Sequence, residues 1–553
     1  MSQVYNPYPV DQLLHWAKQK PDDIWLIQPG PRVTQRYTWG QAAEQIGRMA
    51  SALRARQWPA GSCVAISGLN SAHWLMADLA IQMAGLTPVG LYPRQAPQAT
   101  TWILEHCDAK AVFMGPMPEG SEFVSAVPAG VLRVSLPYAG APEGDTSWDV
   151  MIRSHLPLRR YERPAPETLA TLVYTSGTTG EPKGVMLSYG NLAFTAAVFR
   201  EVVPGRADER LFSYLPLAHV LERAAVEMAS LYWGSSVFFL ERIEKMAEQL
   251  PEAAPTRFFA VPLVLSRLQT GFTARIPEWR LRELVGRRFI GPLLRRRLLA
   301  RVGLERTRAV FCAAAPVPEA TLRFFRDVFG IDVLECYGQS EALYCSMNRP
   351  GAQRLGSVGK PFSDANLRLS AEGEIQVRHP GVMLGYYKEP ERTADAFTPD
   401  GWLRTGDLGR FDADGFLYIT GRIKDIFKTA KGKYVAPSPI EGALVGGNDD
   451  IDQLCLVGTH LTQPVMIVSL SRTALLKPRQ VVEARLLADM ERVNAPLEDH
   501  EKIAKLVLVK DRWTAEDGLL TPTLKVRRGD VEARYAEVVA REAQQREVLI
   551  SWV

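Results

Sequence analysis

The stretch LATLVYTSGTTGEPKGVMLS, Leu169 to Ser188, places a loop of glycine and hydroxyl residues between two apolar runs. From Tyr174 to Gly184 it holds three glycines, one proline, four aliphatic hydroxyl side chains and one lysine. The apolar runs predict two strands, and Ser188 is a suitable N-cap for a helix that begins near Tyr189. The sequence therefore predicts a glycine-rich loop between two strands.

The composition of this loop suits a polyphosphate ligand. Glycine lets backbone amides surround an anion, hydroxyl groups donate to phosphate oxygens, and a lysine adds positive charge. The loop is not a Walker A motif, because Lys183 follows Pro182 and precedes Gly184, where that motif has serine or threonine. A flexible surface turn uses the same residue types, so composition alone leaves both interpretations open.

Helical and strand patterns alternate on the N-terminal side of the loop. WGQAAEQIGRMASALRAR (39–56) has a helical period, whereas SCVAIS (62–67) and AVFMG (111–115) are typical of short strands. The most apolar stretch, Trp74 to Tyr92, is interrupted by polar residues, glycine and proline, which favours a buried helix and strand over a membrane span. Residues 116–166 are dense in proline and glycine and are expected to be a surface connection. This alternation predicts an α/β fold with parallel strands.

The expected secondary structure changes in the C-terminal part of the chain. From Gly356 short strands and turns dominate, as in GEIQVRH and ADGFLYITG. After Arg422 a lysine-rich segment leads into a smaller α+β pattern. We therefore expect a large domain over residues 1–422 and a small domain over residues 423–553.

The length and composition of the chain limit the classes of function that it can have. The chain has 553 residues, enough for several domains, and a formal net charge of +4, too dilute to predict a nucleic acid partner. Its six cysteines show no zinc-ligand spacing, so we expect reduced structural thiols. The first thirty residues contain no secretory signal pattern. These features favour a cytoplasmic protein.

Seven stretches, in one order along the chain, resemble the motifs of the adenylate-forming superfamily. YTSGTTGEPKGVMLS is similar to its phosphate-binding signature. The others are YLPLAHVLER (214–223), AAAPVP (313–318), YGQSEA (337–342), GWLRTGD (401–407), GRIKDIFKTAKGKYVAP (421–437) and TPTLKVRR (521–528). LPLAHVLER and TPTLKVRR look most like the fatty acyl-CoA synthetase branch.

The resemblance implies a fold and a reaction. It implies a large N-terminal adenylation domain of layered α/β subdomains and a small, mobile α+β C-terminal domain. The enzyme would join a small carboxylic acid to ATP with magnesium, release pyrophosphate, and pass the acyl group to coenzyme A. Since carboxylate and α-phosphate are both anionic, catalysis needs cations and exact positioning of the reactants.

The resemblance also assigns site residues. Lys525 is the expected catalytic cation, Glu341 with Thr175 the magnesium site, and Asp407 the ribose contact. The residues expected to bind ATP are Thr175, Ser176, Gly177, Thr178, Thr179, Gly180, Lys183, Ala314, Ala315, Tyr337, Gly338, Ser340, Asp407 and Arg422.

The remaining assignments concern the acyl group and the thiol. His219 and Gly338 are expected beside the acyl group, and Lys424 is the expected hinge of the small domain. Lys431 and Gly432 are expected to line the coenzyme A channel. Many relatives have two glycines at the latter pair, so the backbone here should be stiffer and more positive, and a carrier-protein phosphopantetheine stays an alternative acceptor.

The motif AAAPVP also departs from the family, which usually has glycines there. Alanine is small enough to line an adenine slot, but a positive φ would be strained.

Two other functions have partial support in the sequence. GQSEA at 338–342 comes within one residue of the GxSxG elbow of serine hydrolases, but the final glycine is missing. His379, His460 and His500 stand in stretches without a triad pattern. A nucleotide-binding scaffold without turnover is a further alternative, against which the joint presence of Lys183, Glu341, Asp407, Arg422 and Lys525 speaks.

The run GRRFIGPLLRRRLLARVGLERTR, Gly286 to Arg308, is rich in arginine. A basic amphipathic helix binds anionic lipid at a membrane surface, whereas most such runs are solvated helix faces. Peripheral membrane contact is therefore one expectation for this segment. The acyl group is expected to be medium or long and aliphatic, but no motif reports its length.

Overall fold

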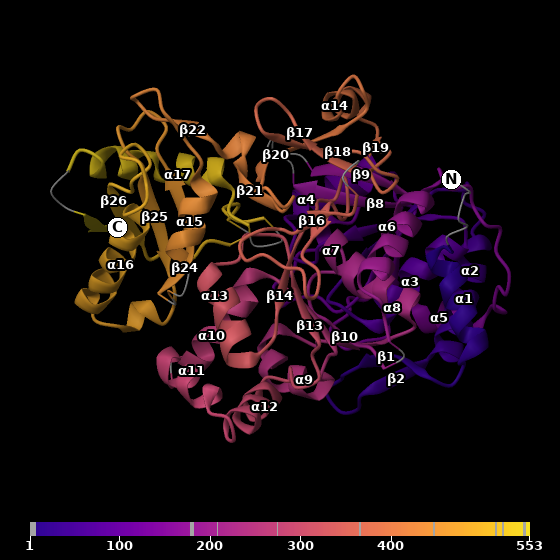
Figure 1. Cartoon of the computed structure of the whole chain (residues 1–553). Helices are drawn as coiled ribbons and strands as arrows, with labels where there is room; N and C mark the ends of the chain where they lie inside the picture. The colour runs from indigo at the N-terminus through magenta and orange to yellow at the C-terminus, as the bar shows by residue number, and fades with distance from the viewer. Residues whose placement is uncertain are drawn as a thin grey trace.

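The protein forms a large domain and a smaller C-terminal domain (Figure 1). The computed structural model describes residues 7–176, 182–206, 208–273, 275–363, 366–445, 448, 450–514, 517–521, 525–545 and 549–553. The predicted α/β class is confirmed, because helices pack on several sheets, some of them with parallel strands.

The largest sheet has the strand order β19-β9-β8-β4-β3-β5-β6-β7. Its neighbours β4, β3, β5 and β6 are parallel, as the alternating pattern predicted. The strands are β3 (Cys63–Ser67), β4 (Thr87–Leu91), β5 (Ala111–Met114), β6 (Leu132–Ser135), β7 (Thr146–Ser147), β8 (Leu169–Ser176), β9 (Pro182–Ser188) and β19 (Gly385–Tyr386).

The stretch quoted first forms the antiparallel pair β8 and β9, as predicted. The Ser188 hydroxyl accepts a hydrogen bond from the Asn191 amide at 3.1 Å and caps α6 (Tyr189–Val202). The strand pair thus flanks the glycine-rich segment on both sides, and the capped helix follows its second strand directly.

The N-terminal helices cover this sheet. They are α1 (Pro9–Gln19), α2 (Trp39–Arg54), α3 (Ala72–Met83) and α4 (Pro97–His106). Every residue of α3 is buried, and the chain then enters β4. The apolar stretch from Trp74 is therefore a core helix followed by a core strand, as predicted. Among the described residues no helix is long and apolar enough to cross a membrane.

The expectation for residues 116–166 was wrong. This segment contributes β6 and β7 to the main sheet, followed by α5 (Trp148–Arg153). Val134 and Trp148 are fully buried. Proline and glycine mark the turns correctly, but elements of two to six residues are too short to show a period, and their burial depends on the neighbouring strand β5.

A second and a third sheet complete the body of the large domain. One has the order β10-β11-β1-β2, with β1 (Ile24–Gln28), β2 (Gln35–Thr38), β10 (Arg210–Ser213) and β11 (Ser236–Phe239). The other has the order β12-β13-β14-β15-β16, with β12 (Arg257–Ala260), β13 (Ala309–Cys312), β14 (Val333–Tyr337), β15 (Ser346–Met347) and β16 (Lys360–Pro361). Between β10 and β11 the chain forms α7 (Val220–Glu222), the π-helix η2 (Arg223–Met228) and α8 (Ala229–Trp233), and α9 (Met246–Ala253) lies between β11 and β12.

Four helices lie beside the third sheet at the lower edge of Figure 1. They are α10 (Pro262–Thr273), α11 (Glu278–Gly286), α12 (Gly291–Arg301) and α13 (Glu319–Phe324), the last continuing into the π-helix η4 (Phe325–Phe329). Phe324, Phe325 and Phe329 are almost fully buried and anchor this subdomain.

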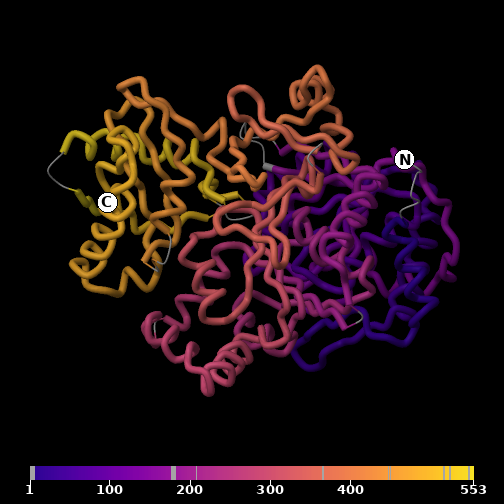
Figure 2. Tube along the Cα trace, in the orientation of Figure 1, coloured from indigo at the N-terminus to yellow at the C-terminus, as the bar shows by residue number. Residues whose placement is uncertain are grey.

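A fourth sheet leads to the small domain. Its order is β17-β18-β20-β21, with β17 (Leu367–Leu369), β18 (Glu374–Val377), β20 (Leu403–Phe411) and β21 (Leu417–Arg422); α14 (Pro390–Ala396) precedes β20. The short helix η6 (Ile423–Asp425) follows β21 directly. In the tube of Figure 2 the orange chain leaves the large domain at this point.

The small domain has its own sheet and core. The sheet order is β24-β25-β26-β27, with β24 (Ile451–Val457), β25 (Val465–Leu470), β26 (Lys505–Val509) and β27 (Ile550–Trp552). The hairpin β22 (Phe427–Lys428) and β23 (Tyr434–Val435) and the helices α15 (Pro437–Val445), α16 (Arg479–Asn494) and α17 (Arg528–Glu542) pack around it. All six cysteines of the chain are buried and unpaired.

Candidate active site

An ion pair on the last two strands of the large domain marks the centre of the site. Asp407 on β20 and Arg422 on β21 are direct Cα partners across the antiparallel pair. The Arg422 Nε atom lies 2.9 Å from the Asp407 Oδ1 atom. Desolvation opposes the charge of Arg422, but Asp407 raises the pKa of the guanidinium above its ordinary value. The pair places one fixed cation at the start of the interdomain connection.

Tyr337, the last residue of β14, joins this pair. Its hydroxyl donates a hydrogen bond of 2.8 Å to Asp407 Oδ2. The ring is only partly buried, so part of its surface is accessible to a ligand. The next residue must be glycine, because a Cβ on Gly338 would lie 1.7 Å from the Leu343 carbonyl oxygen.

Glu341 follows on the same turn and is held by the main sheet. Its Oε1 atom accepts a hydrogen bond of 2.9 Å from the Tyr386 hydroxyl on β19. β19 pairs with β9, with Tyr386 opposite Val185. The Lys183 ammonium lies 4.9 Å from the centre of the Tyr386 ring. Tyr386, which the sequence motifs did not single out, therefore joins Glu341 to the flank of the glycine-rich loop.

Thr175 and Lys183 face each other across β8 and β9, where they are Cα partners. The predicted phosphate contacts Gly177, Thr178, Thr179 and Gly180 lie outside the described residues. For Ser176 the structure gives the backbone, paired with Pro182.

Lys525 is supplied by the small domain. The Lys525 amide donates to the Thr521 hydroxyl at 3.1 Å, and the Lys525 carbonyl accepts from the Thr521 amide at 2.8 Å. The side chain is accessible to water, yet the surrounding protein desolvates it and lowers its pKa. The charge of Arg422 lowers this pKa further, while Asp407 and Glu341 raise it. The structure thus brings Lys525 to the site that the large domain builds.

His219 belongs to the same neighbourhood. Its Nδ1 atom accepts a hydrogen bond of 3.1 Å from the Leu221 amide and caps the short helix α7. Burial, followed by the charge of Lys525, lowers the pKa of His219 to about 4. The ring is therefore neutral at pH 7 and serves as a packed cap beside the site.

Positive charge is in excess around these residues. The pKa of Lys183 is lowered by desolvation and by the charges of Arg392 and Lys424, which Glu341 and Glu389 only partly offset. Lys424 lies in η6, at the connection between the domains. Lys183 and Lys525 both have lowered pKa values and both lie near the charge of Glu341, an arrangement typical of a binding site for an anion.

Ala314 and Ala315 lie exposed after β13. Ala314 has a φ of 76°, in the left-handed region. An alanine there costs about 1 to 2 kcal/mol relative to a right-handed conformation, so the backbone shape that glycine usually supplies is kept here under strain.

Lys431 and Gly432 lie in the turn between β22 and β23 of the small domain, both exposed. Gly432 has a φ of 75° and its amide donates to the Thr429 carbonyl. Within the described ranges no hydrogen bond or ion pair joins this turn to Asp407, Arg422 or Glu341. The structure therefore does not bring these two residues together with the others.

An apolar cavity lies behind the site. It begins at Val220, next to His219, and at Leu343 and Tyr344, which follow Glu341. The other lining residues are Thr171, Val173, Leu187, Leu192, Thr195, Ala196, Phe199, Arg223, Ala224, Met228, Ala229, Tyr232 and Trp233. No motif predicted this cavity; the only signal was the set of small residues on α6, η2 and α8.

A buried charge cluster closes one wall of this cavity. Arg223 Nη2 lies 2.5 Å from Asp78 Oδ1, and Arg223 Nε lies 3.3 Å from Glu227 Oε2. Arg223 Nη1 donates to the Thr171 hydroxyl at 2.6 Å. Burial, and then Asp78, raise the pKa of Glu227 well above its ordinary value. Sequence reasoning missed the role of Arg223, since its partner Asp78 is 145 positions away in the chain.

The other chemistries weighed for this site find little support. In the part of the chain that the structure describes, no hydrogen bond joins Ser340 to a histidine, and no cluster of three metal-ligating side chains occurs. Magnesium is commonly held by one or two carboxylates together with substrate phosphates, so the single carboxylate of Glu341 is compatible with it.

Comparisons with known proteins agree with the geometry. The family described as AMP-binding enzyme matches residues 13–387. The family described as AMP-binding enzyme C-terminal domain matches residues 424–546.

Among curated proteins the chain resembles long-chain acyl-CoA synthetases. It is 31% identical to the long-chain-fatty-acid–CoA ligase FadD15 of Mycobacterium bovis, over 90% of this chain and 91% of that protein. It is 29% identical to the peroxisomal long chain acyl-CoA synthetase 7 of Arabidopsis thaliana, over 91% of this chain and 81% of that protein.

Solved structures share the fold. The anthranilate CoA ligase AuaEII in complex with anthranoyl-AMP superimposes with a TM-score of 0.78 at 21% identity, covering 97% of this chain and 98% of that chain. The adenylation domain of a carboxylic acid reductase from Segniliparus rugosus, in complex with AMP and a carboxylic acid, gives a TM-score of 0.79 at 20% identity, covering 98% and 95%.

Proposed function

Because this chain belongs to the AMP-binding enzyme family, we propose that it is an AMP-forming acyl-CoA synthetase that activates a medium- or long-chain fatty acid with ATP. The observation that carries the proposal is the meeting of Lys525 from the small domain with Asp407, Arg422 and Glu341 of the large domain. The identity to long-chain acyl-CoA synthetases over most of their length supports the substrate class.

In the first half-reaction the fatty carboxylate attacks the α-phosphate of ATP, forming acyl-AMP and pyrophosphate. Lys525 is the catalytic cation that offsets the negative charge shared by the attacking carboxylate and the phosphate. Its lowered pKa, with desolvation as the main cause, indicates a site that becomes more favourable for this lysine once an anion arrives.

The nucleotide is held by groups from five strands, β8, β9, β14, β20 and β21. Asp407 accepts hydrogen bonds from the ribose hydroxyls, Arg422 contacts the phosphate side, and the Tyr337 ring stacks on adenine beside Gly338, Ala314 and Ala315. The β8–β9 segment, including Thr175, Ser176 and Lys183, cradles the β- and γ-phosphates. Partial exposure of Tyr337 supports the stacking role.

Magnesium is part of the proposal. Glu341, with the Thr175 hydroxyl, would hold the ion, which when bound would neutralise phosphate charge. Tyr386 fixes one oxygen of Glu341 at 2.9 Å and leaves Oε2 without a hydrogen bond among the described residues. This free oxygen supports the assignment.

In the second half-reaction coenzyme A attacks acyl-AMP after the small domain rotates. Lys424, in η6 at the domain connection, is the proposed hinge, with residues 1–422 as the large domain and 423–553 as the small one. Lys431 and Gly432 would line the thiol channel after rotation. No hydrogen bond or ion pair among the described residues joins them to the site in the present arrangement, so this role requires a second orientation of the small domain.

The apolar cavity is the proposed acyl site, with His219 at its entrance. Its lining is almost wholly aliphatic and aromatic, and each buried methylene of a bound acid contributes about 0.8 kcal/mol. The apolar lining supports an aliphatic acyl group, which would have to widen the cavity, whose volume is about 30 Å³. We place the enzyme in the cytoplasm.

A panel of carboxylic acids tests the function directly. Acids from acetate through long fatty acids to aryl acids are offered with ATP, magnesium and coenzyme A, and AMP and acyl-CoA are measured. We expect both products with medium or long aliphatic acids. Pyrophosphate release without acyl-CoA formation would instead favour an acyl-AMP ligase that loads a carrier protein, and no AMP with any acid would refute the proposal.

A narrowed cavity tests the acyl site. Ala196 lines the cavity, and Ala196→Leu would fill part of it. We expect kcat/KM for long acids to fall by about tenfold to a hundredfold, with activity on short acids retained as the internal control for folding. An equal loss with every acid would argue against this cavity as the acyl site.

A further inference from the structure

The turn between α11 and α12 exposes large apolar side chains to water. Phe289 is 88% exposed, Ile290 55% and Leu293 53%. A single exposed apolar residue is ordinary, but three within five positions form a contiguous patch that calls for a partner. On α11, Trp279 is also 67% exposed.

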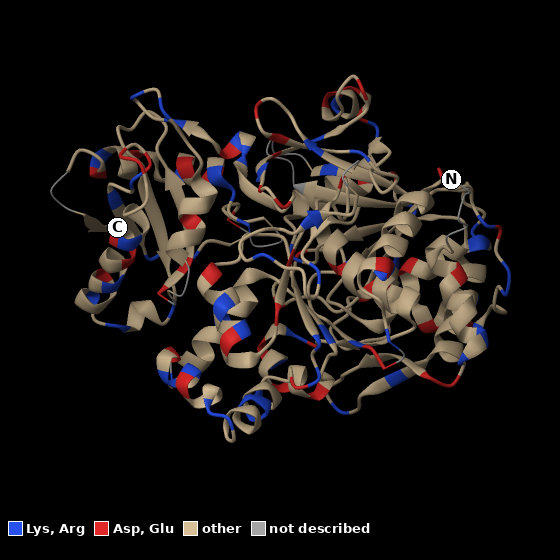
Figure 3. Ribbon diagram, in the orientation of Figure 1, with Lys and Arg blue, Asp and Glu red and all other residues tan. Residues whose placement is uncertain are grey.

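Arginines surround this patch. From Trp279 to Arg301 the chain has eight arginines, no lysine or aspartate, and one glutamate, a net charge of +7, whereas the whole protein carries +4. In Figure 3, α12 at the lower edge of the molecule is blue, whereas α11 carries both blue and red. Positive charge is therefore concentrated on residues 279–301.

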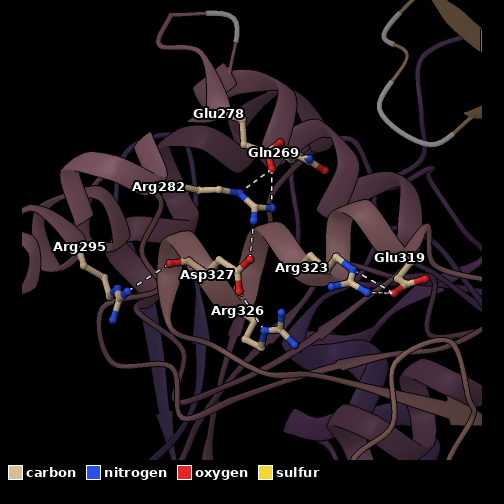
Figure 4. Close-up of polar contacts among 8 residues, drawn as sticks. All are labelled: Gln269, Glu278, Arg282, Arg295, Glu319, Arg323, Arg326 and Asp327. Carbon is tan, nitrogen blue, oxygen red and sulfur yellow. Dashed lines mark hydrogen bonds and ion pairs between the residues drawn. The ribbon is translucent and has the colours of Figure 1, made fainter. Parts of the chain in front are cut away.

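Some of these arginines hold the subdomain together. Arg282 forms ion pairs with Glu278 at 2.7 Å and with Asp327 at 2.6 Å (Figure 4). Arg295 donates to the Val328 carbonyl at 3.1 Å and to the Asp327 carbonyl at 3.2 Å. These two arginines tie α11 and α12 to η4, so the turn is presented by a rigid support.

Others face solvent without a partner. Arg296, Arg297 and Arg301 are exposed and make no ion pair or hydrogen bond with any part of the chain that the structure describes. Among the described residues, the Arg288 guanidinium contacts the ring of Phe289, 5.9 Å from its centre. We call the exposed set Arg288, Phe289, Ile290, Leu293, Arg296, Arg297 and Arg301 the α11–α12 turn surface.

The turn surface is also sterically accessible. In Figures 1 and 2 the connection between α11 and α12 forms the outermost point of the lower edge, away from the small domain. A flat partner can therefore reach it without touching the small domain.

We propose that the α11–α12 turn surface docks this protein on a membrane that contains anionic lipids. Phe289, Ile290 and Leu293 enter the boundary between headgroups and acyl chains, and the unpaired arginines bind lipid phosphates. Arginine suits this role because its planar guanidinium pairs with phosphate oxygens bidentately. The apolar tip favours a membrane over an acidic protein, which would need the arginines but not a protruding hydrocarbon surface.

Vesicle sedimentation with the full chain tests this proposal. The protein is mixed with phosphatidylcholine vesicles that either contain or lack phosphatidylglycerol, at low and at high salt. We expect sedimentation with the anionic vesicles only, weakened by salt. No sedimentation with phosphatidylglycerol vesicles at low salt would overturn the proposal, whatever the activity assay shows.

Two variants separate the two kinds of contact. Arg288→Ala/Arg296→Ala/Arg297→Ala should weaken vesicle binding about 100-fold, and Phe289→Ser/Ile290→Ser should weaken it about tenfold or more. AMP formation from a short soluble acid should be unchanged in both, which shows that they fold. Unchanged vesicle binding in either variant would contradict the proposed mode.

Matched controls exist elsewhere on the surface. Leu476 in the small domain is exposed to the same fraction as Phe289, 88%, so Leu476→Ser removes a highly exposed apolar side chain at another place. Arg153→Ala/Arg159→Ala/Arg160→Ala removes the same charge from exposed arginines outside the turn surface. Both controls should bind like the parent. If an acidic acyl carrier protein bound the parent but not the arginine variant, and vesicles bound neither, the surface would belong to a protein partner and the membrane proposal would fall.

Discussion

Two arginine–carboxylate clusters of the large domain contain the same chemical groups in opposite environments. Arg223 keeps 6% of its side chain exposed, and its partners Asp78 and Glu227 keep none. Arg422 keeps 48% exposed beside Asp407 at 11%. The first cluster is closed, whereas the second still has accessible donors.

The difference in exposure indicates which cluster stabilises the fold and which one can bind substrate. A fully buried guanidinium must keep its carboxylates, because an unpaired buried charge is strongly destabilising. A half-exposed guanidinium contributes little to stability and can bind an anion that arrives from solution. The Arg223 cluster therefore fixes η2 and the cavity wall, and the Arg422 cluster, with Lys525 beside it, is available to substrate.

The same substitution in both clusters gives the largest expected contrast. Arg223→Met leaves Asp78 and Glu227 without a cation and should lower the free energy of unfolding by about 3 to 5 kcal/mol. Arg422→Met should change it by less than about 1 kcal/mol while reducing AMP formation. Urea unfolding followed by tryptophan fluorescence measures the free energy of unfolding of both variants. Equal losses would contradict the distinction between a stabilising and an accessible cluster.

Removal of the Lys525 ammonium should slow the reaction without lowering the free energy of unfolding. Lys525→Ala is expected to slow acyl-AMP formation about 100- to 1000-fold, the scale of losing one preorganised donor. Thioester formation from supplied acyl-AMP should suffer less. Single-turnover assays of each half-reaction measure this, with Lys502→Ala, a lysine of the same domain paired with Asp499, as the control. An equal loss in both half-reactions would refute the assignment of Lys525.

A proline at the connection between the domains tests whether acyl transfer requires the small domain to rotate. Lys424→Pro fixes φ at this position and should slow acyl transfer to coenzyme A about 100-fold, the scale of a misplaced reacting group. Acyl-AMP formation should change much less. Lys424→Ala, which keeps backbone freedom, is the control, and intact transfer in the proline variant would count against a hinge here.

The smallest expected effect concerns pH. Glu222 accepts hydrogen bonds from the Ser213 hydroxyl at 2.7 Å and the Tyr214 amide at 3.1 Å, and burial raises its pKa from 4.5 to about 8. Between these values the folded state keeps a proton that the unfolded chain has lost. The free energy of unfolding therefore falls as pH rises, by at most about 1.4 kcal/mol per pH unit.

Glu222→Gln removes this titration and keeps the acceptor oxygen. Urea unfolding at pH 5, 6, 7 and 8 should show a shallower fall for the variant than for the parent. The difference between the two proteins isolates the contribution of Glu222 from that of His73. Burial lowers the pKa of His73 from 6.5 to about 3, so between these values His73 makes the free energy of unfolding rise with pH. Parallel curves would show that Glu222 is ionised in the folded protein.

Part of the site could be predicted because its residues sit in contiguous motifs. Tyr337, Gly338 and Glu341 come from one turn after a strand, and the shape of that turn requires glycine at 338. Tyr386 could not be predicted, since it reaches Glu341 through the pairing of β19 with β9, a contact between segments about 200 residues apart in sequence. The strands within residues 116–166 were missed for the same reason: their burial is supplied by neighbours and not by their own pattern.

The sequence by itself determined the local features of this protein. The strand–loop–strand stretch, the Ser188 cap and the buried helix α3 follow from residue spacing and side-chain chemistry over fewer than twenty positions. Only the tertiary structure decided which charged side chains lie close together. Arg223 found Asp78, and Lys525 reached Asp407 and Glu341, across more than a hundred residues of chain. Burial and pKa depend on every atom packed around a group, so no spacing within the chain reports whether a cation is buried for stability or left open for substrate.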